Sequence, residues 1–304
     1  MGSFPSSYLL QKFILELDGK PVGPISPLSL PAIKGTVVTE PTGFDGHQTK
    51  RMVPDAPDEL VFSFGPGMSR DIFDWIKQSF KSNYSRKNGS VVVVDQKQVE
   101  VQRLDFSFGL ISSVKLPKVD KLSRDPAAIE VHLRVEDVKM LGPGKQSSAN
   151  LYLTGARVPW NLSEFRLRIS GLEKESDAVT EVGAIEFKTS IRSDVTGDSR
   201  NTNYSPGNSS FGDIEISLPA VSAKTFYDWL EDTVQKGFGD TGERNGSLEY
   251  LSPGSKNAYF TLDLAGIGIV SSDLPKGSEQ SQLPVKVRLY CESIDFSASS
   301  TAVR

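Results

Sequence analysis

An internal repeat constrains this chain more than any other feature of its sequence. The segment Phe13–Gly19 alternates apolar and polar residues and ends on a glycine, and Phe165–Gly171 does the same about 152 residues later. Such alternation is typical of a half-buried strand, with the glycine in the turn that follows. Four further matches follow in the same order, with offsets of about 152 to 158 residues. The sequence therefore predicts two tandem copies of one fold.

The second match predicts one helix in each copy. Ser69–Ile76 reappears as Ala223–Leu230, and apolar residues four apart continue each segment as a stripe that suits packing on a core. We expect Ser69 and Ser222 to cap these helices. The shared motif is an aromatic residue, an aspartate and a tryptophan: Phe73, Asp74, Trp75 and Tyr227, Asp228, Trp229. We expect the aspartates in the first helical turns, where they favour the helix dipole, and the tryptophans to be packing residues.

The remaining matches predict strands separated by turns. Asn88-Gly89 and Asn245-Gly246 suit tight turns, because both residue types tolerate a positive φ. The strands expected after them are 90–95, 101–110 and 129–135 in the first copy, and 247–251, 258–267 and 285–291 in the second. Cys291 ends the last of these strands and is expected to be a small buried side chain.

This pattern predicts a mainly β protein with two tandem domains, residues 1–145 and 146–304. Each domain would be a β-sandwich or small barrel with one α-helix. The boundary is expected in the turn-rich stretch 142–148. Residues 39–57 and 193–212 occupy equivalent places before the two helices and are rich in Gly, Asn, Ser, Thr and Pro. They are predicted to be long irregular loops, either floppy or ordered by a neighbouring subunit.

Catalytic and cofactor motifs are not found in the sequence. The chain has two histidines, His47 and His132, and one cysteine, in no spacing that suits a zinc site or a catalytic triad. His132 alternates with apolar residues on a strand and is expected to face solvent or a partner. Residues 1–149 carry 19 basic and 17 acidic side chains, or +2, and residues 150–304 carry 15 and 21, or −6. Neither half is basic enough for a dedicated nucleic-acid site. We expect no enzyme activity and no cofactor.

The repeated motifs resemble those of the contractile-tail tube family, which includes phage tail tube proteins and the tubes of extracellular injection systems. The resemblance covers most of residues 8–141 and, more weakly, residues 163–297. It is carried by an alternating strand, the helix motif, a basic turn that enters a strand at 86–95, and the strand 129–135. The motif residues are Phe13, Leu15, Leu17, Gly19, Phe73, Asp74, Trp75, Asn88 and Gly89, with Tyr227, Asp228, Trp229, Asn245 and Gly246 in the second copy.

The resemblance implies a structural role in rings of six tube-like domains stacked around a channel. Three chains would supply six domains. The chain would be a tube subunit, or alternatively a hub, initiator or terminal adaptor ring; a carbohydrate-binding β-sandwich is the third hypothesis. The implied partners are the chain itself and sheath, hub or baseplate proteins, with DNA or protein only as a passenger and no membrane.

Candidate inter-ring contacts lie in the two long loops: Thr39, Gly46, His47, Lys50, Arg51, Asp194, Asp198, Asn203 and Tyr204. Residues 1–7 lack the basic head and apolar run of a signal peptide. We therefore expect assembly in the cytoplasm, followed by a place in a virion or an extracellular injection particle.

Overall fold

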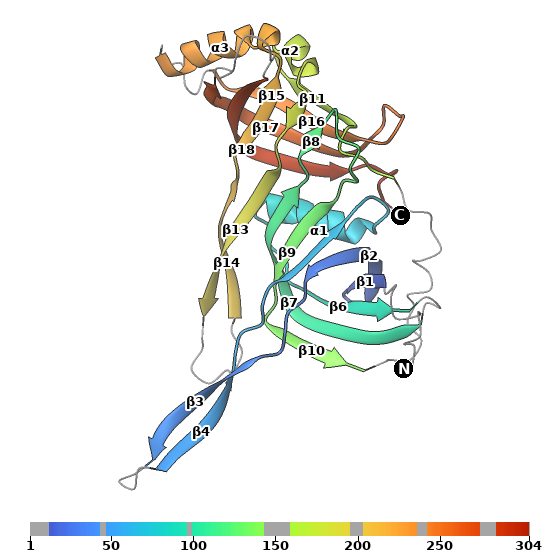
Figure 1. The fold of residues 1–304 in the computed structure, drawn as a ribbon, viewed down its shortest axis with the longest axis vertical. Coiled ribbons are helices and arrows are strands. Elements are labelled where there is room, and N and C mark those ends of the chain that lie inside the picture. Colours follow the sequence, from blue (N-terminus) through green and yellow to red (C-terminus); the bar gives the residue numbers. More distant parts are fainter. Residues whose placement is uncertain are drawn as a thin grey trace, which may run out of the picture.

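The computed structural model describes residues 12–42, 47–95, 99–142, 159–194, 203–235, 242–273 and 284–303. The chain is mainly β, as predicted, and forms a closed six-stranded barrel and a half-barrel that lie end to end (Figure 1). The first half is thus a barrel and not a sandwich. Most of the predicted boundary stretch lies outside the described residues, so the division at 145 and 146 stays a prediction.

The closed barrel contains the strands predicted for the first half and two that were not predicted, β2 (Lys20–Ser29) and β5 (Leu60–Phe64). Its strands follow one another in the order β1 (Lys12–Leu17), β2, β5, β9 (Ile129–Arg134), β7 (Glu100–Leu116) and β6 (Lys87–Val94), which returns to β1. All pairs are antiparallel, and β10 (Asp137–Leu141) adds to the first part of β7. The alternation that predicted these strands arises because one face of each points into the barrel.

The second half repeats this strand order but does not close. Its sheet runs β11 (Phe165–Ile169), β16 (Arg244–Leu251), β17 (Ala258–Asp273), β18 (Val285–Ala298), β15 (Ile214–Leu218), β12 (Glu181–Val182) and β8 (Val119–Asp120). In the first half, the Asp18–Gly19 turn joins β1 directly to the paired β2. In the second half the corresponding connection contains helix α2 (Glu173–Asp177), and β11 and β12 are not paired. The expectation of one helix per copy is therefore wrong for the second half.

The two predicted helices are present, with corrected ends. Helix α1 (Arg70–Phe80) begins after Ser69, whose Oγ accepts a hydrogen bond from the Asp71 amide. Helix α3 (Lys224–Leu230) continues as the π-helical turn η4 (Glu231–Gln235). Ser222 is not its cap, because this serine ends the short 3₁₀ helix η3 (Ala220–Ser222).

The two aspartates of the helix motif lie one turn later than expected. The first-turn acid of α1 is Asp71 and not Asp74, and the first turn of α3 holds no acidic residue. Asp228 instead pairs with Lys224, one turn before it on the same helix, at 2.7 Å. Its position thus favours a side-chain ion pair over the helix dipole.

The stretches predicted as irregular loops are β-hairpins, so that prediction is wrong. Strands β3 (Gly35–Thr42) and β4 (His47–Pro54) pair with each other and project from the body (Figure 1). Strands β13 (Ile185–Asp194) and β14 (Asn203–Phe211) form the second hairpin, which runs beside the first barrel. Below we call β3–β4 the projecting hairpin and β13–β14 the packed hairpin. Most residues in their outer parts are polar, and so the sequence lacks the alternation of a half-buried strand.

The Asn-Gly pairs are not turns but lie within strands β6 and β16. A Cβ on Gly89 would stand 2.4 Å from the Glu16 carbonyl oxygen, and one on Gly246 would stand 2.4 Å from that of Arg168. The glycines therefore allow a close approach of backbones and do not supply a turn. The asparagine Oδ1 atoms accept hydrogen bonds from the amides of Phe108 and Gly266, which both have a positive φ.

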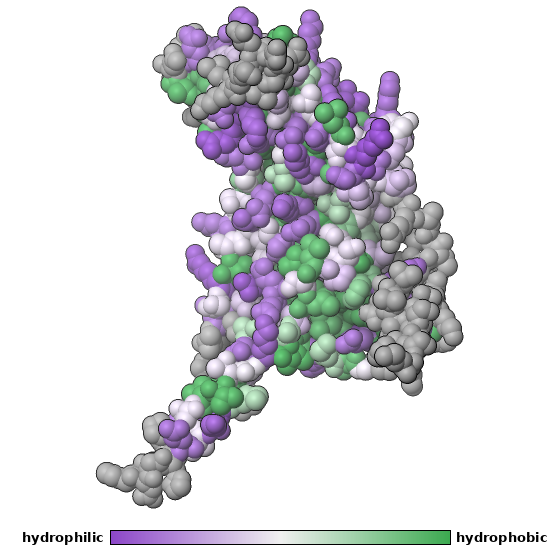
Figure 2. All heavy atoms as spheres, viewed as in Figure 1, coloured by the Kyte–Doolittle hydropathy of each residue, from purple (hydrophilic) through white to green (hydrophobic). Residues whose placement is uncertain are grey.

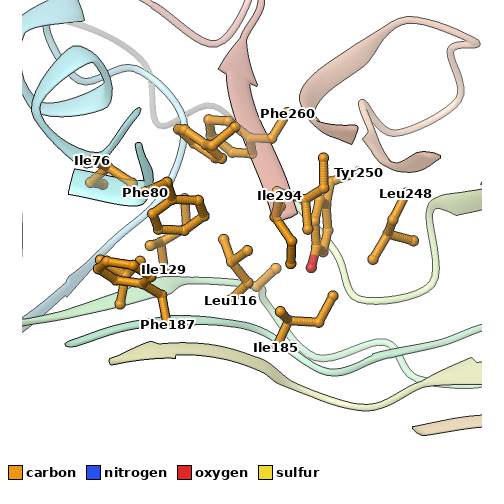
Figure 3. Close-up of a cluster of buried hydrophobic side chains, with 14 of the residues drawn as sticks. Ile76, Phe80, Leu116, Ile129, Ile185, Phe187, Leu248, Tyr250, Phe260 and Ile294 are labelled. Carbon is orange, nitrogen blue, oxygen red and sulfur yellow. The ribbon is translucent and has the colours of Figure 1, made fainter. Parts of the chain in front are cut away.

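One hydrophobic core runs through both halves. Phe80 of α1 stacks on Phe187 of β13 with ring centroids 4.7 Å apart, and the same cluster reaches Phe260 and Ile294 in the second half (Figure 3). The motif tryptophans are buried, as expected: the Trp75 and Trp229 indoles donate to the carbonyls of Ser85 and Gly242 at 2.9 and 2.8 Å. The shared core holds the two halves in one arrangement.

Candidate assembly interface

The side chains of His132 and Cys291 are the first candidates for catalytic chemistry among the described residues. No three of the described His, Cys, Asp or Glu side chains are grouped so as to hold a metal ion. His132 is half-buried, with its ring nitrogens 2.9 Å from Glu130 and 3.3 Å from Glu59. The neighbouring Ser112 hydroxyl donates to Glu59 and not to the imidazole, so this group is not a catalytic triad.

Cys291 is half-buried, less covered than predicted. Its thiol donates to the carbonyls of Ala265 and Ser293, and burial raises its pKa, which disfavours a reactive thiolate. Among the described helices, none has the length and apolar composition needed to cross a membrane.

The most informative geometry is the junction between the two halves. The second part of β7 pairs on one side with β9 of its own barrel and on the other with β13 of the second half. Phe187 stands opposite Val114, and Lys188 stands opposite Ser113. Strands β5, β9, β7, β13 and β14 therefore form one continuous sheet that contains strands of both halves.

This continuous sheet has one apolar and one polar face. Ile129, Val131 and Leu133 of β9 are fully buried, as are Val114 of β7 and Phe187 of β13. The alternate positions carry charged or polar side chains: Glu130, His132, Arg134, Ser113, Lys115, Glu186 and Lys188. The sheet is thus a wall with its helix-covered side inside the molecule and a polar side outside.

A groove of about 820 Å³ lies on the polar side of this wall, lined by residues of β7, β9 and the packed hairpin. Opposite charges pair across its floor, with Arg134 3.1 Å from Glu59 and Lys188 2.9 Å from Glu186. Tyr204 is the one aromatic residue among the described lining residues. The described lining residues therefore do not form the clustered aromatic surface expected of a carbohydrate-binding protein.

The packed hairpin is held to the first half by two kinds of contact. Phe187 and Phe211 lie against Phe80, with ring centroids 4.7 and 5.3 Å from it. The Tyr204 amide donates to Glu136 at 2.9 Å, and Arg86 donates to the Tyr204 carbonyl while pairing with Glu136 at 3.3 Å. These contacts and the β7 edge at 113–116 define what we call the first hairpin-binding site.

The candidate contact residues fall on the two hairpins. Thr39 pairs with Lys50 on the projecting hairpin, and Arg51 with Val38. Asp194 pairs with Asn203 at the outer end of the packed hairpin, whereas Tyr204 is buried against the first half. Gly46 and Asp198 lie outside the described residues, as does the side chain of His47. The inter-ring role of all these residues stays a prediction.

The site residues that sequence reasoning missed are Phe80, Glu136 and Phe187. Phe80 was expected only as part of a helix stripe, and Glu136 follows a strand without any motif. Their role depends on contacts between residues about 70 to 110 positions apart, which no local pattern reveals.

The projecting hairpin carries exposed apolar side chains, and Figure 2 shows an apolar patch on one of its sides. Val37 and Met52 face each other across one side and are 54% and 72% exposed, and Val38 and Val53 lie on the other side. An isolated two-stranded hairpin is marginally stable in water. Grouped exposed apolar side chains are common at surfaces where proteins bind partners.

Comparison with known proteins gives no match to a protein-family model and none among curated proteins. Among solved structures, the chain is similar to a chain of the extended sheath–tube complex of PVC, an extracellular contractile injection system, with 19% identity and a TM-score of 0.36 over 46% of this chain and 92% of that one. A chain from the tube-terminating cap of the anti-feeding prophage is 19% identical, with a TM-score of 0.35 over 47% of this chain and 93% of that one. Hcp1 from Flavobacterium johnsoniae is 10% identical, with a TM-score of 0.28 over 45% of this chain and 96% of that one. Each similarity covers about half of this chain.

Proposed function

We propose that this protein is a structural subunit of a phage tail or contractile injection system, and that three chains form a ring of six tube-like domains around a channel. The observation that carries the proposal is the ladder between β7 and β13. Through it two domain-sized halves of one chain already share a single wall sheet. The family resemblance of the sequence motifs supports the same role.

The wall geometry suits a tube. Its apolar face is covered by α1 and the shared core, and its polar face carries charges of both signs on β7, β9 and β13. Lining a water-filled channel with such a face needs no burial of charge. DNA or protein would pass through the channel only as a passenger, and sheath, hub or baseplate proteins would contact the outside or the ends.

The direction of the junction supports ring closure. In the chain, the first half binds the hairpin of the second half, which is a head-to-tail contact between unlike surfaces. Repeating such a contact produces a ring when the rotation closes. Six domains complete the ring in the family that the sequence resembles, and each chain would supply two of them.

A terminal, hub or adaptor ring is the second candidate, and a specific observation favours it. The first half is a closed barrel, whereas α2 separates β11 from β12 in the second half, where β8 borders the sheet instead. The two halves therefore offer different surfaces to whatever stacks on the ring. Such alternation suits a ring placed between two unlike neighbours.

The mass of the assembled particle tests the proposal. Native mass spectrometry of the full chain is expected to give about 100 kDa, three times the 33.2 kDa of one chain. Electron microscopy of the same sample then separates the two candidates, because long tubes support the main tube subunit and single rings support the adaptor. Monomers at all concentrations tested would contradict both.

A further inference from the structure

We infer that the second half holds a second hairpin-binding site, and that it is occupied by the projecting hairpin of another copy of this chain. The site consists of the β17 edge at 268–273, Val234, Glu243 and Glu292. This inference rests on the proposed ring and names the surfaces that close it. Four independent features of the structure support it.

The first feature is that β17 reproduces β7 residue by residue. The register of β7 against β9 shifts between Ile111 and Ser113, and that of β17 against β18 shifts between Ile269 and Ser271. Residues 113–115 of β7, which pair with the packed hairpin, therefore correspond to residues 271–273 of β17. On the side of β17 that pairs with β16, the ladder ends at Ile267. No described strand pairs with residues 268–273 on that side. This is an open edge of backbone donors and acceptors.

The second feature is that the projecting hairpin holds the place of the packed hairpin. Strand β2 pairs with β5 just as β12 pairs with β15, and each chain segment then continues into its hairpin. Residues 30–34 therefore correspond to the start of β13. Ile185 and Phe187 are buried there, whereas Ile33 is 62% exposed and Leu30 is also exposed. The root of the projecting hairpin thus has apolar side chains without a cover.

The third feature is the uncovered end of the second helix. Phe80 ends the apolar stripe of α1 and is buried under the packed hairpin. Val234 ends the corresponding stripe in η4 and is 62% exposed. If the projecting hairpin added to the β17 edge, Val234 would be buried together with the exposed apolar side chains of the hairpin.

The fourth feature is a matched change of charge. Asn88 and Asn245 have equivalent partners, so two residues before them Arg86 corresponds to Glu243. Leu133 and Leu289 also have equivalent partners, so three residues after them Glu136 corresponds to Glu292. The first site thus has one charge of each sign, and the second has two negative charges. Counted along the hairpins, Tyr204 corresponds to Lys50 or Arg51, which are both exposed. The acidic site therefore suits the basic hairpin and not the packed one, which gives the contact its direction.

A charge-exchange experiment tests this assignment. Sedimentation velocity would measure association of the full chain, of Lys50→Glu/Arg51→Glu, of Glu243→Lys/Glu292→Lys, and of the chain with all four changes. We expect each double variant to weaken association at least tenfold, and the combined variant to recover most of that loss. Glu292→Lys alone should show part of the effect, and it leaves the Tyr290–Glu243 hydrogen bond intact.

The control is Lys20→Glu/Lys174→Glu, which changes the net charge by the same amount as the first variant at exposed positions outside both sites. It should associate like wild type, and the urea midpoint of each variant should show that the monomers stay folded. If wild type forms rings but the double variants associate normally, or fail to recover when combined, this inference is overturned and the proposed function stands. If wild type does not associate at all, both are overturned.

Discussion

Replacing Phe187 with alanine tests whether the packed hairpin is part of one shared core. Phe187 is fully buried and lies against Phe80 and Phe211, at ring centroid distances of 4.7 and 5.3 Å. Losing the burial of its side chain costs about 1.5–3 kcal/mol. A residual cavity of about 60 Å³ would add about 1.5 kcal/mol at about 24 cal/mol per Å³. We therefore expect the free energy of unfolding to fall by about 3–4.5 kcal/mol.

Urea unfolding of the dilute, monomeric protein followed by tryptophan fluorescence measures this loss. The matched control is Val234→Ala, at the exposed helix end of the second half, where a change within about 0.5 kcal/mol is expected in the monomer. A loss below about 1 kcal/mol for Phe187→Ala would show that the hairpin does not pack on α1 and would refute the shared core.

Three further predictions follow from other parts of the structure. Burial raises the pKa of the Tyr250 phenol above its ordinary value, so the stability that its protonated form supports is present below about pH 10 and is lost as the pH rises further. The wild type should thus lose up to about 1.4 kcal/mol per pH unit relative to Tyr250→Phe between about pH 10 and 11, whereas parallel urea curves would contradict the burial. Gly89→Ala and Gly246→Ala should each lower the free energy of unfolding by about 1–3 kcal/mol, because the new Cβ meets a backbone oxygen at 2.4 Å. Gly142→Ala, whose Cβ meets nothing within 4 Å, should leave it unchanged, and equal melting temperatures for all three variants would contradict this prediction. Replacing residues 38–51 by an Asn-Gly turn should leave the circular dichroism and thermal melting of the monomer unchanged. The sedimentation of the assembled protein should shift to smaller species. Unchanged sedimentation would show that the hairpin takes no part in assembly.

The helices α1 and α3 and several of the barrel strands could be predicted from local patterns. Phe13–Gly19 and Ile129–Val135 alternate because one side of each strand faces the barrel interior, and the stripe through Ile72 and Phe80 reflects a helix packed on one face. These signals lie within single elements and therefore appear in the sequence.

The junction and the hairpins could not be predicted in the same way. The pairing of Phe187 with Val114 joins residues about 70 positions apart, and nothing near either residue specifies the other. Asn88-Gly89 carried a turn signal, but the glycine is required by the close approach of β1, which only the folded barrel reveals. The described candidate assembly residues fall on the two hairpins, and their role in assembly stays a prediction. The contacts that hold the packed hairpin, such as those of Arg86 and Glu136, became visible only in the structure.

A cryo-electron microscopy reconstruction of the assembled particle, computed without imposed symmetry, tests the central claim most directly. We predict three chains around one channel, with closed barrels and half-barrels alternating and the projecting hairpin of each chain lying along β17 of the next. A ring of six full chains, with one half of each outside the wall, would contradict the account.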